Sequence, residues 1–201
     1  SGKSTLARLN QGLYVPQVGL VQMDGLDIRE IDLPHLRRSI GVVLQENYFF
    51  RGTVRENIAL TKPQARFEEI VNASILAGAD EFVKKLPQGY DEPVMERGAT
   101  LSTGQRQLIA FARVLAYDPT IFILDEATSN IDTETELLIQ DALAKLIVNR
   151  TSIIIAHRLS TIHHADRIIV LHKGEIVEEG SHFELLDQKG LYYDLYRLQY
   201  T

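Results

Sequence analysis

Three short, mostly apolar runs divide the chain, at residues 40–44, 121–124 and 152–156. None of them alternates between apolar and polar positions, a pattern typical of strands buried on both faces of a parallel sheet. Polar side chains follow each run at once, namely Gln45, Asp125 with Glu126, and His157. The pattern therefore predicts an α/β fold whose central strands deliver polar side chains to one edge of the sheet.

Between these runs, apolar residues recur at the spacing of amphipathic helices. The four clearest sets are Leu6, Leu9 and Leu13; Phe67, Ile70, Val71, Ser74 and Ile75; Leu108, Ile109, Phe111, Ala112 and Leu115; and Leu137, Leu138, Ala142, Leu143, Leu146 and Ile147. Reciprocal capping boxes, a Ser or Thr followed three residues later by Glu or Gln, mark helix starts. They are Thr53 with Glu56, Ser102 with Gln105, Thr133 with Glu136, and Ser181 with Glu184.

Turn residues complete the expected outline. A short strand at 19–23 closes in the Asp24–Gly25 turn, and a hairpin folds around Lys173–Gly174. The stretch 87–98, punctuated by Pro and Gly, is predicted to be an exposed loop. The remaining aromatic and imidazole side chains are interpreted as packing and surface residues respectively; they are Tyr192, Tyr193, Tyr196 and Tyr200, and His163 and His164.

Composition narrows the class of protein. The net charge of −6 provides no basic surface, so nucleic acid is not an expected partner. The chain has no cysteine, which excludes a disulfide framework and a thiolate zinc site. Its apolar runs are far shorter than the roughly 20 residues of a membrane span, so the chain is not expected to cross a bilayer itself.

Asp125 and Glu126 are two adjacent carboxylates at the end of the central predicted strand. A solvated strand end would account for them. The alternative is a ligand site, because ligands of open α/β sheets bind at the carboxyl ends of the strands and Mg²⁺ is held through carboxylates and phosphates. In that interpretation Asp125 holds the metal through water and Glu126 polarises an attacking water.

Gly2-Lys3-Ser4 matches the last three positions of the phosphate-binding loop pattern and opens a predicted helix. A helix N-terminus would then face phosphate, with Lys3 on the outer phosphates and the Ser4 hydroxyl on Mg²⁺. Half of the motif is missing, and a flexible polar terminus is the alternative.

Three further positions carry a structural and a functional interpretation. Gln45 is either a polar loop residue or a metal ligand through its amide oxygen. The capped segment 102–105, with Gly104 in the first turn, is either a plain N-cap or an anion site. His157 is either solvated or placed to meet a γ-phosphate.

Taken together, these segments make the chain resemble the nucleotide-binding domain of ATP-binding cassette (ABC) transporters from Ser1 almost to its C-terminus. Six ordered motifs carry the resemblance: Ser1–Thr5 the end of Walker A, Gln45 the Q-loop, Leu101–Gln105 the signature motif, Ile121–Asp125 Walker B, Ser129–Asp132 the D-loop, and His157 the H-loop. The resemblance implies a P-loop NTPase core with a parallel sheet flanked by helices. Residues 1–201 would form one ABC-type ATPase domain, with a helical subdomain at approximately 46–112 that carries the signature motif.

The resemblance also implies a mechanism. Two such domains close head to tail around two ATP molecules with Mg²⁺. One subunit supplies the phosphate, metal and catalytic groups, and the other supplies the signature segment. The implied residues are Gly2, Lys3, Ser4, Thr5, Gln45, Ser102, Gly104, Gln105 and Asp132 for ATP; Ser4, Gln45 and Asp125 for the metal; and Glu126 and His157 for catalysis.

The segments 47–58 and 96–98 resemble those of exporters whose membrane domain is fused ahead of the nucleotide-binding domain. The implied place is the cytoplasmic side of the cell membrane, with the two segments facing the cytoplasmic ends of transmembrane helices. The absent Met and the abrupt start at Ser1 fit a chain cut inside Walker A. A soluble ABC ATPase of DNA repair or translation, and a nucleotide-gated switch without catalysis, are the alternatives.

One position departs from the family pattern, which has Gly where this chain has Thr103. The chain therefore resembles one subunit of a heterodimeric multidrug exporter. Under this hypothesis the subunit supplies Glu126 to the competent ATP site and its Thr103 segment to a weaker one. The alternative is that Thr103 is harmless.

Overall fold

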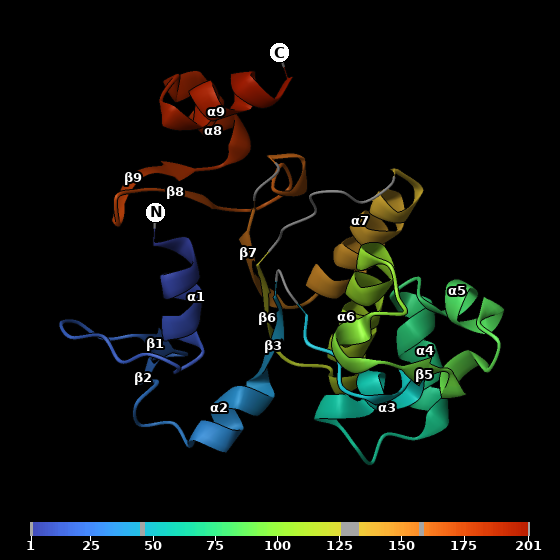
Figure 1. Cartoon of the computed structure of the whole chain (residues 1–201). Coiled ribbons are helices and arrows are strands. Elements are labelled where there is room, and N and C mark those ends of the chain that lie inside the picture. The colour runs from blue at the N-terminus through green and yellow to red at the C-terminus, as the bar shows by residue number, and fades with distance from the viewer. Residues whose placement is uncertain (1, 45–46, 126–132, 157–158, 201) are drawn as a thin grey trace. The chain divides into compact units, whose positions relative to one another are not determined.

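The computed structural model describes residues 2–44, 47–125, 133–156 and 159–200 (Figure 1). Contacts divide the chain into two compact units, one formed by Ser1–Leu36 with Ile154–Thr201 and the other by Arg37–Ile153. The predicted helical subdomain at 46–112 falls inside the second unit, and its bounds remain a prediction. Among the described residues, no helix combines the length and apolar character that crossing a bilayer requires.

The three predicted central strands form one sheet in the order β3 (Ile40–Val43), β6 (Ile121–Asp125) and β7 (Thr151–Ile155). β3 and β6 pair in parallel, with Val43 opposite Leu124, as predicted. The interior of β6 is buried on both faces. β7 is an outer strand among these three and buries only Ile155, so the prediction of a third fully buried strand is wrong.

Gly41 shows why β3 and helix α6 (Thr103–Tyr117) pack so closely. A Cβ built on Gly41 would lie 2.4 Å from Cγ of Pro119 and 2.8 Å from Cγ1 of Val114, distances that no methyl group tolerates. Only a residue without a side chain lets the strand pass this close to the end of the helix.

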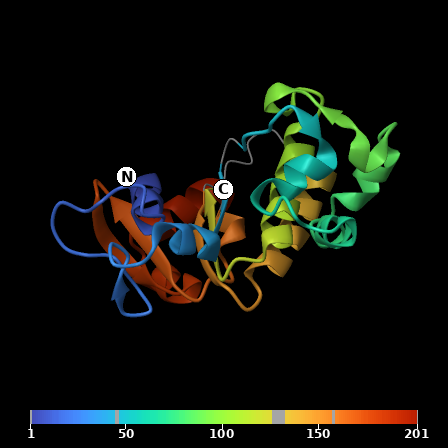
Figure 2. The same cartoon turned by 90° about the horizontal axis from the view of Figure 1, so that it is seen from below.

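Helix α6 is the centre of its unit. Four of its apolar residues, Leu108, Ile109, Phe111 and Ala112, are at most 2% exposed, which confirms the predicted apolar side. Figures 1 and 2 show α7 (Thr133–Ile147) beside it. The other elements of this unit are α3 Val54–Ile58, α4 Phe67–Leu76, α5 Asp80–Lys85, the paired strands β4 Gly52–Thr53 and β5 Pro93–Val94, and the 3-10 turns η1 Ala59–Thr61, η2 Gly89–Asp91 and η3 Glu96–Gly98.

Three helices expose apolar residues that the sequence pattern assigned to an apolar face; in α1 (Lys3–Asn10), Leu6 is 42% exposed. In α4 the buried face is Ile70, Ala73 and Ser74, whereas Phe67 and Ile75 are 54% and 51% exposed. α6 covers only part of the apolar stripe of α4, so the remainder faces outwards. In α7, Leu137 and Leu138 are also exposed, at 67% and 40%.

One further prediction in this unit is wrong. The stretch 87–98 is not simply an exposed loop, because it contains β5 and two 3-10 turns and buries Tyr90, Val94 and Gly98. Tyr90 donates a hydrogen bond to Asp80 at 2.8 Å, and this contact fixes the stretch. The capping box expected at Thr133 stays a prediction, because residues 126–132 and the Thr133 side chain lie outside the described part of the structure.

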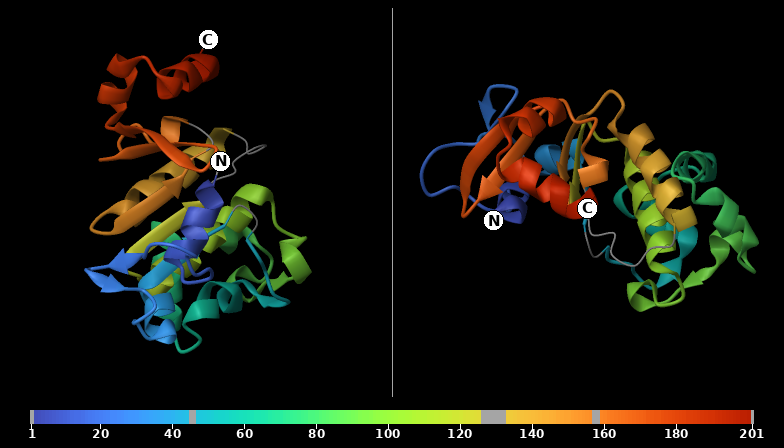
Figure 3. Two further views of the ribbon diagram at one scale, coloured as in Figure 1. Left: turned by 90° about the vertical axis from the view of Figure 1, so that its left-hand side faces the viewer. Right: turned by 90° about the horizontal axis from the view of Figure 1, so that it is seen from above.

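The first unit contains the predicted hairpin. β8 (Ile168–His172) and β9 (Glu175–Gly180) pair in antiparallel fashion around Lys173 and Gly174, whose φ angles of 51° and 91° are left-handed. Figure 3 shows α8 (His182–Gln188) and α9 (Leu191–Tyr200) following this hairpin. Its other elements are α1 Lys3–Asn10, β1 Gln22–Met23, β2 Leu26–Asp27 and η4 Leu159–Thr161; α2, Leu33–Ser39, runs across the boundary between the units.

The hairpin and the last two helices share a small core. Ile168, Val170, Leu185 and Tyr192 are its buried members. Glu178 on β9 accepts hydrogen bonds from the backbone N–H groups of Leu191 and Tyr192, so one carboxylate caps the first turn of α9. Burial of Tyr192 confirms the packing interpretation for that tyrosine.

A pair of stacked histidines lies against this core. The ring of His163 is centred 4.5 Å from that of His182, whose Nδ1 lies 2.8 Å from the hydroxyl of Tyr192. His163 is therefore a partly buried packing residue, not the surface histidine that was predicted. Burial lowers the pKa of His163, and charge on His182 and His164 lowers it further.

We predict that His163 makes this chain less stable in acid. The unfolded side chain takes up a proton near pH 6.5, whereas the folded one resists it until the pH falls further. The contribution of His163 to the free energy of unfolding is thus fully present above pH 6.5, and it is lost as the pH falls through the lowered pKa. Urea unfolding at pH 7 and pH 5 will show a smaller pH effect in His163→Gln than in the original chain. The exposed neighbour provides the control, His164→Gln; equal pH effects in all three chains would contradict the prediction.

Candidate functional site

Helix α6 begins in the predicted capping box. Ser102 Oγ accepts a hydrogen bond from the N–H of Gln105 at 3.1 Å, and Gln105 Oε1 accepts one from the N–H of Ser102 at 2.9 Å. The first N–H groups of a helix have no acceptor within the helix, and those of Thr103 and Gly104 remain outside the box. The first turn therefore presents two N–H groups and the positive end of the helix dipole to an anion.

Arg106 fixes the loop in front of α6, a role that the sequence pattern did not indicate. Its Nη1 donates to the carbonyl of Leu101 at 2.7 Å and to that of Gly98 at 3.4 Å. Its Nη2 donates to Oγ1 of Thr103 at 3.1 Å. The only signal in the sequence was a basic residue one position after the motif.

The paired strands place Asp125 at a sheet edge. Because Val43 lies opposite Leu124, the next positions along the two strands, Leu44 and Asp125, share the carboxyl end of the sheet. Asp125 is partly exposed there. Asp125 thus lies at the sheet edge to which β3 also leads, a position that suits the metal ligand expected there.

The Gly2-Lys3-Ser4 segment opens helix α1 as predicted. Gly2 occupies the N-cap position with φ of 95°, a left-handed conformation that favours glycine, and its carbonyl accepts from the N–H of Leu6 at 3.0 Å. Lys3, Ser4 and Thr5 are the first three residues of the helix, and the last two are exposed. The helix N-terminus, an ammonium and a hydroxyl are thus together at one turn, a set that suits phosphate.

Four of the expected site residues, Gln45, Glu126, Asp132 and His157, lie outside the described residues. Within the described ranges, no three His, Cys, Asp or Glu side chains gather in a metal-binding cluster. The expected metal set is of another kind, since it combines a hydroxyl, an amide and one carboxylate from Ser4, Gln45 and Asp125. All of its donors are oxygens, as Mg²⁺ prefers.

A second cluster joins the segment after β3 to α6. The guanidinium of Arg113 donates to the carbonyl of Asn57 at 2.8 Å and to that of Tyr48 at 3.3 Å, and it lies 5.2 Å from the ring centre of Phe49. Burial lowers the pKa of Arg113 to about 10. The buried Asn57 amide also binds the carbonyl and the N–H of Phe50, at 2.9 and 3.0 Å. These contacts hold residues 48–50 firmly against the helix.

The fixed segment has an exposed aromatic surface. Tyr48 and Phe50 are 51% and 50% exposed, and their rings meet edge to face at 4.8 Å between centroids. Phe49 between them is fully buried. Because the backbone is tied down on both sides of Phe49, the two exposed rings form a rigid apolar feature.

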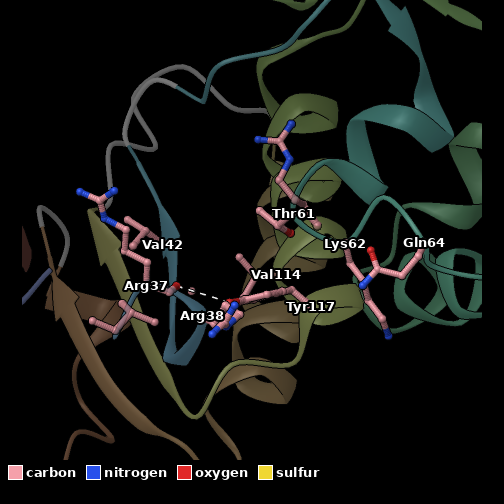
Figure 4. Close-up of a pocket in the computed structure, with 11 residues that line it drawn as sticks. Arg37, Arg38, Val42, Thr61, Lys62, Gln64, Val114 and Tyr117 are labelled. Carbon is pink, nitrogen blue, oxygen red and sulfur yellow. Dashed lines mark hydrogen bonds between the residues drawn. The ribbon is translucent and has the colours of Figure 1, made fainter. Parts of the chain in front are cut away.

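A pocket of about 420 Å³ lies between β3, α6 and η1 (Figure 4). Val42, Val114 and Arg38 contribute to its walls, and Thr61 lines it from η1. Tyr117 on α6 donates a hydrogen bond at 3.5 Å to a backbone carbonyl at the end of α2. Sequence reasoning gave no indication of this pocket, because its walls come from elements far apart in the chain.

Comparison with known proteins identifies related chains. A family model described as ABC transporter matches residues 1–129. The ABC transporter ATP-binding protein YknV of Bacillus subtilis is 51% identical over 201 residues, which are all of this chain and 33% of YknV. The leukotoxin export ATP-binding protein LtxB of Aggregatibacter actinomycetemcomitans is 53% identical over 200 residues, 99% of this chain and 28% of LtxB.

A solved structure is similar over the whole chain. A bacterial Atm1-family ABC exporter with ATP bound superposes with a TM-score of 0.93 at 42% identity, covering all of this chain and 35% of the exporter chain. The match confirms the predicted α/β fold of an ABC-type ATPase. This chain spans about a third of the length of these relatives.

Proposed function

This chain belongs to the ABC transporter family, and from that premise we propose that it is the ATP-binding and ATP-hydrolysing domain of an exporter. Members of the family couple ATP hydrolysis to transport and work as pairs of such domains. The single observation that carries the hydrolytic part is the parallel register of β3 with β6, which sets Asp125 at the sheet edge where residue 45 follows. The names of relatives such as LtxB support export over the soluble alternative.

In the proposed ATP site, the chain's own groups bind and orient the nucleotide. The N–H groups of the first turn of α1 and the Lys3 ammonium hold the phosphates. Ser4, Gln45 and Asp125 would hold Mg²⁺, which supplies neutralisation of the charge that develops on the phosphates. Gly2 permits the turn that brings the backbone close to the ligand.

Catalysis in this proposal depends on two groups. Glu126 accepts a proton from the attacking water and orients it, and His157 donates a hydrogen bond to the terminal phosphate. The first turn of α6 in the paired domain, with Ser102, Gly104 and Gln105, closes over the same phosphate, and Asp132 would contribute to ATP binding. The rate arises from positioning and electrostatic stabilisation, not from a covalent intermediate.

We predict that Glu126→Gln abolishes turnover but preserves binding. Loss of a positioned general base costs about 10²–10⁴-fold in rate, whereas the amide keeps the shape of the side chain. Turnover and MgATP affinity are to be measured on the complete transporter. Glu81→Gln, an exposed carboxylate on α5, is the matched control and leaves both unchanged. Most of the turnover surviving in Glu126→Gln would refute the assignment.

For the membrane partner, we propose that the exposed aromatic surface of Tyr48 and Phe50 docks a transmembrane domain at the cytoplasmic face of the cell membrane. Two rigid, exposed aromatic rings bury a large apolar area at little conformational cost, as interface anchors do. Arg113 ties the backbone of Tyr48 to α6, and Asn57 ties that of Phe50 to α3, which supports coupling between this surface and the helix. A heterodimer with a second ABC domain is the proposed assembly, and the transported substrate would contact the membrane part.

The docking proposal predicts uncoupling. Replacing Tyr48 and Phe50 together by Ser lowers transport about tenfold or more, since loss of a buried aromatic anchor typically costs 2 kcal/mol or more, while ATP affinity stays within about twofold. The measurement is substrate efflux from vesicles containing the complete transporter. Phe183→Ser, which removes a 75% exposed aromatic ring from α8, serves as the control. Unchanged efflux in the Tyr48 and Phe50 variant would disprove docking at this surface.

A further inference from the structure

Thr103 stands where an ABC signature motif has glycine, and its side chain makes a hydrogen bond that glycine cannot make. Its Oγ1 accepts a hydrogen bond from Nη2 of Arg106 at 3.1 Å. The same guanidinium donates through Nη1 to the carbonyls of Leu101 and Gly98. Arg106 therefore connects three points of the loop that precedes α6 and of the helix itself, namely Gly98, Leu101 and the first helical residue, Thr103.

The loop that Arg106 spans is conformationally demanding. Arg97 and Gly98 have left-handed φ angles of 60° and 67°, and the first of them is not glycine. A left-handed conformation costs free energy at a residue with a Cβ, so tertiary contacts must hold it. The hydrogen bonds from Arg97 N–H to Phe49 at 3.2 Å and from Leu101 N–H to Gly98 at 2.9 Å are two such contacts.

The close packing of Arg106 and Phe49 on Gly98 also supports a role for Arg106 in holding this loop. A Cβ on Gly98 would lie 2.9 Å from Cδ of Arg106 and 3.2 Å from Cγ of Phe49, so the glycine leaves room for the arginine stem to cross the loop. A cation in the first turn of a helix is unfavourable because it opposes the helix dipole. Arg106 is nevertheless held there, with the carbonyls of Gly98 and Leu101 and the Thr103 hydroxyl as acceptors.

We infer that Thr103 is a positioning residue for ATP turnover, because its hydroxyl completes the Arg106 clamp that fixes the 98–102 loop on the first turn of α6. This rests on the proposed function, in which that turn closes on ATP held by the paired domain. A glycine at 103 would leave Nη2 of Arg106 without this acceptor and the loop with one connection fewer. Thr103 thus compensates for the missing glycine instead of merely weakening the motif.

The test compares three substitutions in the complete transporter. Thr103→Ser keeps the hydroxyl and will stay within about twofold of the original KM for ATP. Thr103→Val, which keeps the shape, and Thr103→Gly, which restores the family residue, will both raise KM by about threefold to tenfold, the value of one ordinary hydrogen bond at an exposed position. Because the clamp acts on closure around ATP and touches no reacting atom, kcat will change less than KM.

A second measurement makes the two proposals separable. Hydrogen exchange of the amides of residues 98–102 without nucleotide will be faster in the Val and Gly variants and unchanged in the Ser variant. A transporter with no ATP turnover, but with this exchange pattern, would reject the proposed function and keep the clamp. Exchange that is equal in all variants, or a Thr103→Gly chain with unchanged or lower KM, would overturn the inference.

Discussion

A helix cannot satisfy the first N–H groups of its own backbone, and the proposed chemistry depends on that constraint at two places. Helix α1 begins at Lys3 after a left-handed glycine, and α6 begins at Thr103 after a serine cap. At α6 the reciprocal box engages only the N–H groups of Ser102 and Gln105. Both helix starts therefore suit phosphate. In the proposed assembly, one belongs to the domain that grips ATP and the other to the domain that closes on it.

The rest of the second unit keeps α6 in place. Gly41 lets β3 pass against the end of the helix, and Arg113 ties the segment after β3 to its side. Arg106 ties the preceding loop to its first turn. One helix thus contacts the sheet that carries Asp125, the segment with the exposed rings of Tyr48 and Phe50, and the loop before its own first turn.

The sequence predicted those elements whose burial follows from local pattern. Strands β3 and β6, the Lys173–Gly174 hairpin and the caps at Ser102 and Ser181 are of this kind. Other features depend on which partner covers which surface, and a periodic pattern does not contain that information. Ile75 lies on the apolar stripe of α4 yet faces outwards, and Tyr90 is buried because Asp80, ten residues away, accepts its hydrogen bond.

The candidate site was predictable where motif residues stand in order, and it was not where side chains meet only after folding. The pattern indicated Lys3, Ser4 and Asp125, but gave no hint that Arg106 and Thr103 share a hydrogen bond or that Arg113 is buried beside Phe49. An arginine's partners can be any acceptor within reach of a long side chain. Which acceptor an arginine binds depends on the path of the backbone, which the sequence pattern does not give.

The central claim is that ATP is held by α1 of one domain and by the first turn of α6 of its partner. These 201 residues contain no cysteine, so the introduced ones are the only thiols in this domain, and any cysteine elsewhere in the transporter is first replaced by serine. Arg8→Cys on α1 and Thr100→Cys beside α6, both at exposed positions, are to be placed in separate subunits of the complete transporter and treated with a short bifunctional maleimide. The account predicts a cross-link between subunits that forms when ATP is trapped and is lost without nucleotide. Cross-linking that is absent in the ATP-trapped state, or independent of nucleotide, would contradict it.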